Sequence, residues 1–324
     1  MSTIEQALAK KLAKQQKSES DPTEAANLQS ENSTTETLES SVQTQSVGND
    51  KQVSNIQTAE PNAVTEAVAT HKNKVLQIDL ERLAFHDFIV NQNINEQRIL
   101  KEEFRQIKRK LINNAFGVVA KTLTHSNLIM ITSARPNEGK TFVSINLALS
   151  IALEQDKTVL LVDADVLKPS VLKEFGCEPQ TGLIEYLLDN EVGVGDIIYN
   201  TNINNLKVIP AGTPHHLSNE LLASERMVKL AEELSSRYPD RIVIFDSPPL
   251  LGVNETPVLA QLMGQALITV EENKTAVSDL NNASKLLSDE LAKGVVLNKA
   301  YNSRKEIYGY YGYSGYGYGQ ESSD

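Results

Sequence analysis

The stretch "SARPNEGKTF" at residues 133–142 constrains the fold of this chain more than any other. Within it, "ARPNEGKT" matches the phosphate-loop pattern G-x-x-x-x-G-K-[ST], except that Ala134 replaces the first glycine. The apolar run "NLIMITSA" (127–134) precedes the loop, and the helical pattern "KTFVSINLALSIALEQ" (140–155) follows it. Backbone N–H groups of such a loop can converge on one phosphate. The sequence therefore predicts a strand–loop–helix unit that binds a nucleotide.

Strand and helix patterns alternate after this unit. A helical pattern from Asp79 to about Asn114 precedes it. Such alternation predicts an α/β protein with the P-loop NTPase fold, in which helices cover both faces of a mostly parallel twisted sheet. Ligands then bind beyond the carboxyl ends of the strands. The expected strands are 158–165, 205–211, 241–249, 265–272 and 294–300, and the expected helices are 219–237 and a segment near 275–291.

The loop itself supplies the expected nucleotide contacts. Lys140 is expected to reach the β- and γ-phosphates of ATP, and the Thr141 hydroxyl to bind Mg²⁺. Asn137 stands at an interior loop position where glycine is often found, and asparagine tolerates a positive φ better than most residues. The residues expected to bind the nucleotide are Pro136, Asn137, Glu138, Gly139, Lys140, Thr141 and Phe142.

Acidic residues close two of the predicted strands. Asp163 and Asp165 end "VLLVDAD", and Asp246 ends "IVIFD". Mg²⁺ takes one or two carboxylates together with phosphate oxygens, so Asp246 is expected to hold the metal, directly or through a water. Of the other two, one can serve the metal while the other accepts a proton. Asn298 closes "GVVLN" and is a candidate for adenine contact, although asparagine is also common as a turn residue there.

The rest of the chain is polar or low in complexity. Residues 18–75 are predicted to be a disordered linker, because their composition cannot bury enough apolar surface to offset ordering entropy. Residues 1–17 show a short amphipathic pattern, read either as a frayed terminus or as a docking helix, and the ordered domain is expected at 76–300. The net charge of −11 argues against nucleic-acid binding. No apolar run is long enough to span a bilayer, so the chain is expected to be cytoplasmic.

The C-terminal segment 301–324 is predicted to be a flexible tail. Its core "YGYYGYSGYGYGQ" alternates tyrosine with glycine and cannot pack a hydrophobic core. By itself such a segment is typical of low-complexity chains that associate through aromatic contacts. The upstream nucleotide loop favours another interpretation, in which the tyrosine hydroxyls accept phosphate.

Together these motifs resemble the bacterial tyrosine autokinases of polysaccharide export, most of all the type linked to exosortase and exopolysaccharide loci. The resemblance rests on the loop, on "VLLVDADVLKPS" (159–170), on "IVIFDSPP" (242–249) and on the tail. "NELLASERM" (219–227) and "EEFRQIKRK" (102–110) also resemble segments of that family. The resemblance implies ATP and Mg²⁺ as cofactors and an autokinase activity that regulates exopolysaccharide polymerisation or export.

The resemblance also implies roles for single residues. Lys140, Asp163 and Asp165 would be catalytic, with Asp163 accepting the tyrosine proton, and Thr141, Asp163 and Asp246 would hold the metal. A Gly-rich tail of about 18 residues spans about 25 Å, against about 45 Å for the domain, so transfer between neighbouring subunits is expected. The implied phosphate acceptors are Tyr301, Tyr308, Tyr310, Tyr311, Tyr313, Tyr316 and Tyr318.

The family's partners follow from the same resemblance. Glu102, Arg105 and Lys108 fall on an E-x-x-R-x-x-R pattern that makes the contacts of a ring-like homo-oligomer, with Lys108 in place of the second arginine. A separate membrane polysaccharide co-polymerase is expected to act as adaptor and recruit the chain to the inner membrane, and a tyrosine phosphatase is a further partner. The alternatives are a MinD/ParA-like positioning ATPase, in which a lysine stands where this chain has Arg135, and a nucleotide-gated scaffold without kinase activity.

Overall fold

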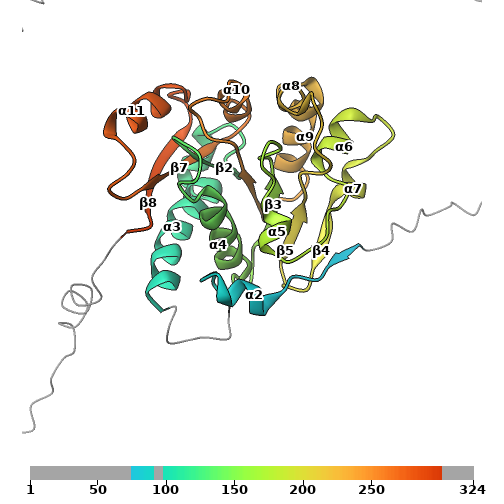
Figure 1. Ribbon diagram of the computed structural model, residues 1–324, viewed down its shortest axis with the longest axis horizontal. Coiled ribbons are helices and arrows are strands. Elements are labelled where there is room, and N and C mark those ends of the chain that lie inside the picture. Colours follow the sequence, from blue (N-terminus) through green and yellow to red (C-terminus); the bar gives the residue numbers. More distant parts are fainter. Residues whose placement is uncertain (1–73, 91–97, 301–324) are drawn as a thin grey trace, which may run out of the picture. The chain divides into compact units, whose positions relative to one another are not determined.

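The structure, a computed structural model, describes residues 74–90 and 98–300 (Figure 1). The predictions for the amphipathic segment, for the tyrosine-rich tail and for the linker as far as residue 73 lie outside the described residues. The last two residues of the predicted linker, Lys74 and Val75, are described, and Val75 lies in a strand. Within the described part, no helix combines the length and the apolar character that crossing a bilayer requires.

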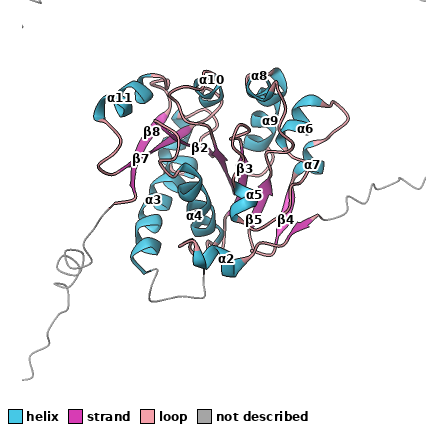
Figure 2. Ribbon diagram, in the orientation of Figure 1, coloured by secondary structure: helices cyan, strands magenta, loops and turns pink. Residues whose placement is uncertain are grey.

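The described strands form one sheet in the order β1-β4-β5-β3-β6-β2-β7-β8 (Figure 2). From β5 to β8 every pair is parallel, whereas β4 is antiparallel to β5 and parallel to β1. The predicted mostly parallel α/β fold is therefore confirmed. The bounds are β1 (Val75–Leu76), β2 (Leu128–Ser133), β3 (Thr158–Asp163), β4 (Tyr199–Thr201), β5 (Leu206–Ile209), β6 (Arg241–Asp246), β7 (Gln265–Glu271) and β8 (Ala292–Asn298).

Helices cover both faces of this sheet, as the buried runs of its central strands require. In β2, Leu128 and Met130 pack into one core with helices α6 to α11, and Ile129 and Ile131 pack into a second core with α2 to α5. Figure 1 shows α3 and α4 side by side, and both helices contribute buried residues to the second core. The bounds are α2 (Leu80–Phe85), α3 (Arg98–Phe116), η1 (Val118–Thr122), α4 (Lys140–Ala152), α5 (Val171–Glu174), α6 (Leu183–Leu188), α7 (Val194–Ile197), α8 (Ser218–Leu222), α9 (Glu225–Ser236), α10 (Glu255–Ala260) and α11 (Val277–Lys285).

Two predicted helices are interrupted in the structure. The pattern from Asp79 to Asn114 divides into α2 and α3, because the chain leaves the helix after Phe85 and adopts a positive φ of 60° at Asp87. The predicted helix 219–237 divides into α8 and α9. Ser224 causes that break, since its side chain accepts a hydrogen bond from the Met227 N–H and so begins a new helix.

Residues 74–90, here called the strap, pack along the domain ahead of α3. The strand β1 within the strap pairs with β4, and the Asp79 N–H donates to the Phe175 carbonyl at 2.9 Å. Near the end of the strap, the Ile89 N–H donates to Asn146 Oδ1 of α4 at 2.7 Å, and Phe88 is buried. The strap is therefore an integral part of the second core.

Candidate active site

The phosphate loop joins β2 to α4 at the carboxyl edge of the sheet. Asn137 and Gly139 both adopt the left-handed conformation, with φ of 67° and 95°. The tolerance predicted for Asn137 is thus used in the structure. At the φ of Gly139 a residue with a Cβ atom would be strained, and that Cβ would lie 2.0 Å from Nδ2 of Asn298, whose side chain would have to move, so the position favours glycine. The loop keeps its shape through these two residues.

Three of the predicted carboxylates meet the loop. Asp163 and Asp246 are register partners at the ends of β3 and β6. The Thr141 hydroxyl donates to Asp246 Oδ2 at 2.6 Å. Lys140 Nζ lies 2.5 Å from Asp165 Oδ2 and 3.9 Å from Asp246 Oδ1. The structure therefore brings together all five residues predicted to handle phosphate and metal.

Burial sets the charge balance of this cluster. It raises the pKa of Asp163 to about 8, with the negative charge of Asp246 adding to the effect and the Val171 N–H opposing it. Burial also raises the pKa of Asp246, against the opposing charge of Lys140. For Lys140 burial lowers the pKa, but Asp246 and Asp165 outweigh it and the pKa is raised. The ammonium thus stays charged, and the site favours either a bound proton or a bound cation on its carboxylates.

The residues present fit a magnesium ion held together with a nucleotide. Asp163 Oδ1 is buried and lacks a hydrogen-bond partner, so one carboxylate oxygen is available for a ligand. In the described part of the chain, no three carboxylate, imidazole or thiolate groups form a complete metal site. Mg²⁺ commonly takes only one or two carboxylates and completes its shell with waters and phosphate oxygens. Thr141, Asp163 and Asp246 are the groups that would hold it.

Two serines in this cluster were missed by the sequence reasoning. Ser170 Oγ lies 2.8 Å from the Thr141 hydroxyl oxygen, and its N–H donates to Asp163 Oδ2 at 3.1 Å. Ser144, one turn into α4, donates to Asp246 Oδ1 at 3.1 Å. Ser170 ends the segment "VLLVDADVLKPS" and stands at the N-cap of α5, but its side chain makes no capping hydrogen bond, so a cap signal would not have revealed its contact with Thr141. Both serines orient the groups expected to hold the metal.

Of the remaining residues predicted to contact the nucleotide, Asn298 and Pro136 lie at the loop, whereas the Phe142 side chain points away from it. Asn298 reaches the loop, and its Nδ2 donates to the Glu138 carbonyl at 2.9 Å. Pro136 is exposed on the loop. The Phe142 ring instead packs toward the strap and α3, 5.3 Å from the Phe88 ring. Only the backbone of Phe142 is therefore expected to serve a nucleotide.

The predicted oligomer contacts on α3 separate into two groups. Arg105 is exposed and donates to Glu102 Oε2 at 2.8 Å. Lys108 is buried, pairs with Glu154 Oε1 at 2.6 Å and donates to the Ser150 carbonyl at 2.9 Å. A buried lysine with two partners in its own chain is not available at the surface. The intersubunit contact therefore stays a prediction for Glu102 and Arg105, and Lys108 instead fastens α3 to the end of α4.

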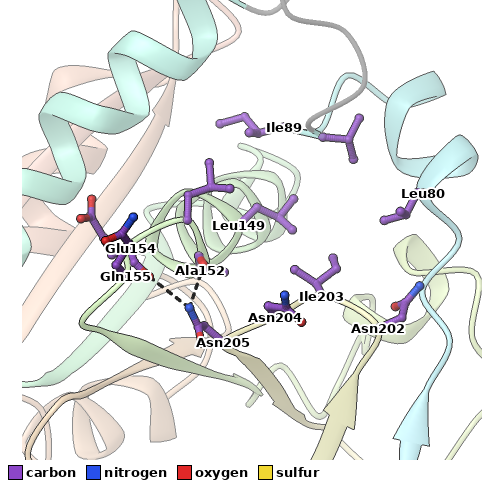
Figure 3. Close-up of a pocket in the computed structure, with 12 residues that line it drawn as sticks. Leu80, Ile89, Leu149, Ala152, Glu154, Gln155, Asn202, Ile203, Asn204 and Asn205 are labelled. Carbon is purple, nitrogen blue, oxygen red and sulfur yellow. Dashed lines mark hydrogen bonds between the residues drawn. The ribbon is translucent and has the colours of Figure 1, made fainter.

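A separate cavity of about 480 Å³ lies away from the phosphate loop and the three carboxylates beside it (Figure 3). Its lining includes Leu80 and Ile89 of the strap, Leu149 of α4 and Asn205 just before β5. The cavity therefore sits near the amino ends of the strands, whereas the phosphate loop follows the carboxyl end of β2. No residue predicted to bind a nucleotide or metal lines it.

Comparisons with known proteins agree with the geometry of the loop and its carboxylates. A family model described as AAA domain matches residues 126–293. The tyrosine-protein kinase YwqD of Bacillus subtilis (strain 168) is 35% identical over 186 residues, which are 57% of this chain and 77% of the relative. The putative tyrosine-protein kinase EpsB of Ralstonia solanacearum is 33% identical over 207 residues, 61% of this chain and 27% of that protein. The chain thus spans about a quarter of EpsB and about three quarters of YwqD.

A solved structure gives the same result for the fold. The kinase domain of the Escherichia coli tyrosine kinase ETK superimposes with a TM-score of 0.55 at 25% identity, over 70% of this chain and 92% of that chain. Both the extent of the family match and the share of YwqD that is covered exceed what a shared loop alone would produce. The chain belongs to the AAA-domain family of P-loop proteins and, within it, to the bacterial tyrosine-protein kinases.

Proposed function

We propose that this chain is an ATP-dependent protein-tyrosine kinase that phosphorylates the tyrosines of its own C-terminal tail. The observation that carries the proposal is the direct bond of the loop hydroxyl of Thr141 to the buried carboxylate of Asp246, beside the ammonium of Lys140. This arrangement joins a phosphate loop to a metal-binding carboxylate at one edge of the sheet. Family membership supports nucleotide binding by the same loop.

Each residue of the site has a part in the proposed reaction. Bound Mg²⁺ would neutralise charge between the β- and γ-phosphates. Lys140 is held by Asp165 in the described state and would turn from that carboxylate to the phosphate oxygens when ATP enters. Thr141, Asp163 and Asp246 would hold the metal, and Asp163 is also the group that would accept the proton from the tyrosine hydroxyl. Because the transition state of phosphoryl transfer is loose, positioning and charge neutralisation are the main demands on the protein.

The proposed acceptors follow closely after the last described residue. They are Tyr301, Tyr308, Tyr310, Tyr311, Tyr313, Tyr316 and Tyr318. Lys299, just ahead of these tyrosines in the sequence, donates to the Asn137 carbonyl of the loop at 2.8 Å. We propose transfer in trans within a ring-like homo-oligomer that uses Glu102 and Arg105. A Gly-rich tail of about 18 residues reaches about 25 Å, against about 45 Å across the domain, so it can reach the site of a neighbouring subunit at least as easily as its own. Each added phosphate brings about −1.5 to −2 charges, which would loosen such a ring.

The proposed setting is exopolysaccharide polymerisation or export. The chain would be a cytoplasmic kinase recruited to the inner membrane by a separate polysaccharide co-polymerase, and a tyrosine phosphatase would reset the tail. The net charge of −11 supports the proposal that nucleic acid is not a partner. The names of the relatives, which call them tyrosine-protein kinases, support the reaction class.

Labelled ATP and magnesium test the proposed function. The purified full chain should acquire label on tail tyrosines, located by mass spectrometry, and Lys140→Met should abolish it. Lys293→Met is the matched control, since Lys293 pairs with Asp289 outside the site and should leave labelling unchanged. Free phosphate without labelled protein would favour a positioning ATPase. A calorimetric titration without uptake of ATP or ADP in the presence of Mg²⁺ would overturn nucleotide binding as well.

A further inference from the structure

The end of β8 is fastened to the phosphate loop by two consecutive side chains. Asn298 Nδ2 donates to the Glu138 carbonyl at 2.9 Å, and Lys299 Nζ donates to the Asn137 carbonyl at 2.8 Å. Lys299 Nζ also lies 2.9 Å from Glu271 Oε2 at the end of β7. Adjacent residues of one strand end thus hold adjacent carbonyls of the loop.

The backbone at this contact adopts an uncommon conformation on both sides. Lys299 has a φ of 55° and Asn137 a φ of 67°. Residues with a Cβ atom seldom adopt positive φ, and they keep it where surrounding contacts determine it. The hydrogen bond from Lys299 to the Asn137 carbonyl and the ion pair with Glu271 are such contacts.

The direction of these carbonyls fixes the direction of the next N–H groups. In a trans peptide the C=O of one residue and the N–H of the next point to opposite sides, and the described chain has no cis peptide bond. A carbonyl of Asn137 turned toward Lys299 therefore turns the Glu138 N–H away from Lys299. In the same way Asn298 turns the Gly139 N–H away from itself. Two successive N–H groups that point to one side form a concavity for an anion.

Other contacts hold the neighbouring parts of the loop, but they do not involve the carbonyl of Asn137. Arg135, Pro136 and Asn137 are exposed, so packing does not fix the peptide between Asn137 and Glu138. The Glu138 side chain is buried and accepts hydrogen bonds from the Arg135 N–H at 2.8 Å and from the Thr275 hydroxyl at 2.5 Å, and the Arg135 guanidinium pairs with Asp279. These contacts order the start of the loop and do not include the Asn137 carbonyl, to which Lys299 donates. We propose that Lys299 is a positioning residue of the nucleotide site, which aims the Glu138 N–H at the nucleotide phosphates by holding the Asn137 carbonyl.

This inference rests on the part of the proposed function that assigns nucleotide binding to the loop. The inference goes beyond the proposed function because it assigns Lys299, the first residue after β8, to the same hydrogen-bonded unit as the phosphate loop. Because coupling between two sites is reciprocal, nucleotide binding should strengthen the contact of Lys299 with the loop to the same degree that this contact strengthens nucleotide binding.

The competing explanation is that Lys299 serves only as a cation for Glu271. Lys274 separates the two, since its Nζ lies 3.2 Å from the same Glu271 Oε2. Lys274→Ala removes a cation from Glu271 and leaves the loop contact of Lys299 in place. Lys299→Gly removes the side chain while keeping positive φ accessible, and Lys299→Ala removes the side chain with added backbone strain. Lys299→Arg keeps a cation that can reach the carbonyl.

Calorimetric titration of the full chain with ADP and Mg²⁺ tests the proposal. Lys299→Gly and Lys299→Ala should bind ADP at least about tenfold more weakly, as expected from the loss of one charge-assisted hydrogen bond, whereas Lys274→Ala should match wild type. Lys299→Arg should restore most of the affinity. The melting temperature without nucleotide should stay near that of wild type, while the rise caused by ADP should shrink in the Lys299→Gly variant. In turnover, KM for ATP should rise and kcat should hold.

Three outcomes would overturn the role of Lys299. They are wild-type ADP affinity in Lys299→Gly, equal weakening in Lys274→Ala, and a loss confined to Lys299→Ala, which would show backbone strain. These results are distinct from a failure of the proposed function. If wild type binds ADP but never labels its tyrosines, the kinase activity is refuted and the positioning role stands.

Discussion

Replacing Asp163 with asparagine should make the metal-free protein more stable while abolishing the proposed phosphate transfer. The Asp163 carboxyl is buried, and its Oδ2 accepts hydrogen bonds from the N–H groups of Ser170 and Val171 at 3.1 and 3.0 Å. Its other oxygen has no hydrogen-bond partner. An asparagine can accept the same two bonds through its carbonyl oxygen, and it brings no charge near Asp246.

The size of the effect follows from the pKa of Asp163. Burial raises it from the ordinary value of 3.8 to about 8. Between these values the folded protein holds a proton that the unfolded chain has released, so this contribution to stability is complete below pH 3.8 and is lost as pH rises through about 8. The loss amounts to about 1.4 kcal/mol per pH unit. The advantage of Asp163→Asn over wild type should therefore grow by about 3 kcal/mol between about pH 5.5 and pH 7.5.

Urea unfolding in EDTA at these two pH values measures the difference. Asp156→Asn is the control. A hydrogen bond from Lys157 lowers the pKa of Asp156, so its contribution is already complete at the lower pH and should not change. If the advantage of Asp163→Asn were the same at both pH values, or fell as pH rose, the reasoning from buried charge would be refuted. Tyrosine labelling of the same variant should be lost.

Three further changes test other contacts. Gly139→Ala places a Cβ atom 2.0 Å from Asn298 Nδ2 at a φ of 95°, so ADP binding should weaken by at least about tenfold in calorimetry, and unchanged affinity would contradict the close approach. Lys108→Ala leaves Glu154 without its partner and removes a buried cation, so the free energy of unfolding in urea should fall by about 2 kcal/mol. A fall of less than about 0.5 kcal/mol would speak against a structural role for Lys108. Ser224→Ala removes the cap of α9 and should lower the melting temperature as expected for about 1 kcal/mol, whereas Ser236→Ala, in the last turn of α9, should have little effect.

The sequence was a good guide to the fold because its strongest signals are local. The apolar run before "RPNEGKT" forms β2, and the helix pattern after it forms α4. Helix ends were harder to predict, since apolar periodicity continues through Ser224 and only its capping bond divides α8 from α9. The pattern from Asp79 to Asn114 likewise hides the turn at Asp87. Periodicity records which side of a segment is apolar and does not record where the backbone turns.

The residues of the candidate site also divide into those that the sequence could identify and those that it could not. Lys140, Thr141 and Asp246 could be identified because loop and strand-end positions carry their own sequence signals. Ser170 and Lys299 could not, because their contacts to Thr141 and Asn137 join segments 29 and 162 residues apart. The E-x-x-R-x-x-R pattern predicted Lys108 as an oligomer contact, but the Lys108 side chain is buried and pairs with Glu154 of its own chain. Contacts between distant segments depend on the assembled sheet and leave no spacing signature in the chain.

The strap sets a practical limit on shortening this protein from its N-terminal side. The family match begins at residue 126, and a cut there would look natural from alignment. Such a cut would discard the Phe88 ring, which packs beside Phe142, and the Ile89 N–H, which donates to Asn146 Oδ1. Phe142 and Asn146 both lie on α4, the helix that starts at Lys140. A truncated domain for crystallisation or enzyme assays should therefore begin ahead of Lys74, so that the helix beginning at Lys140 keeps its contacts with the strap.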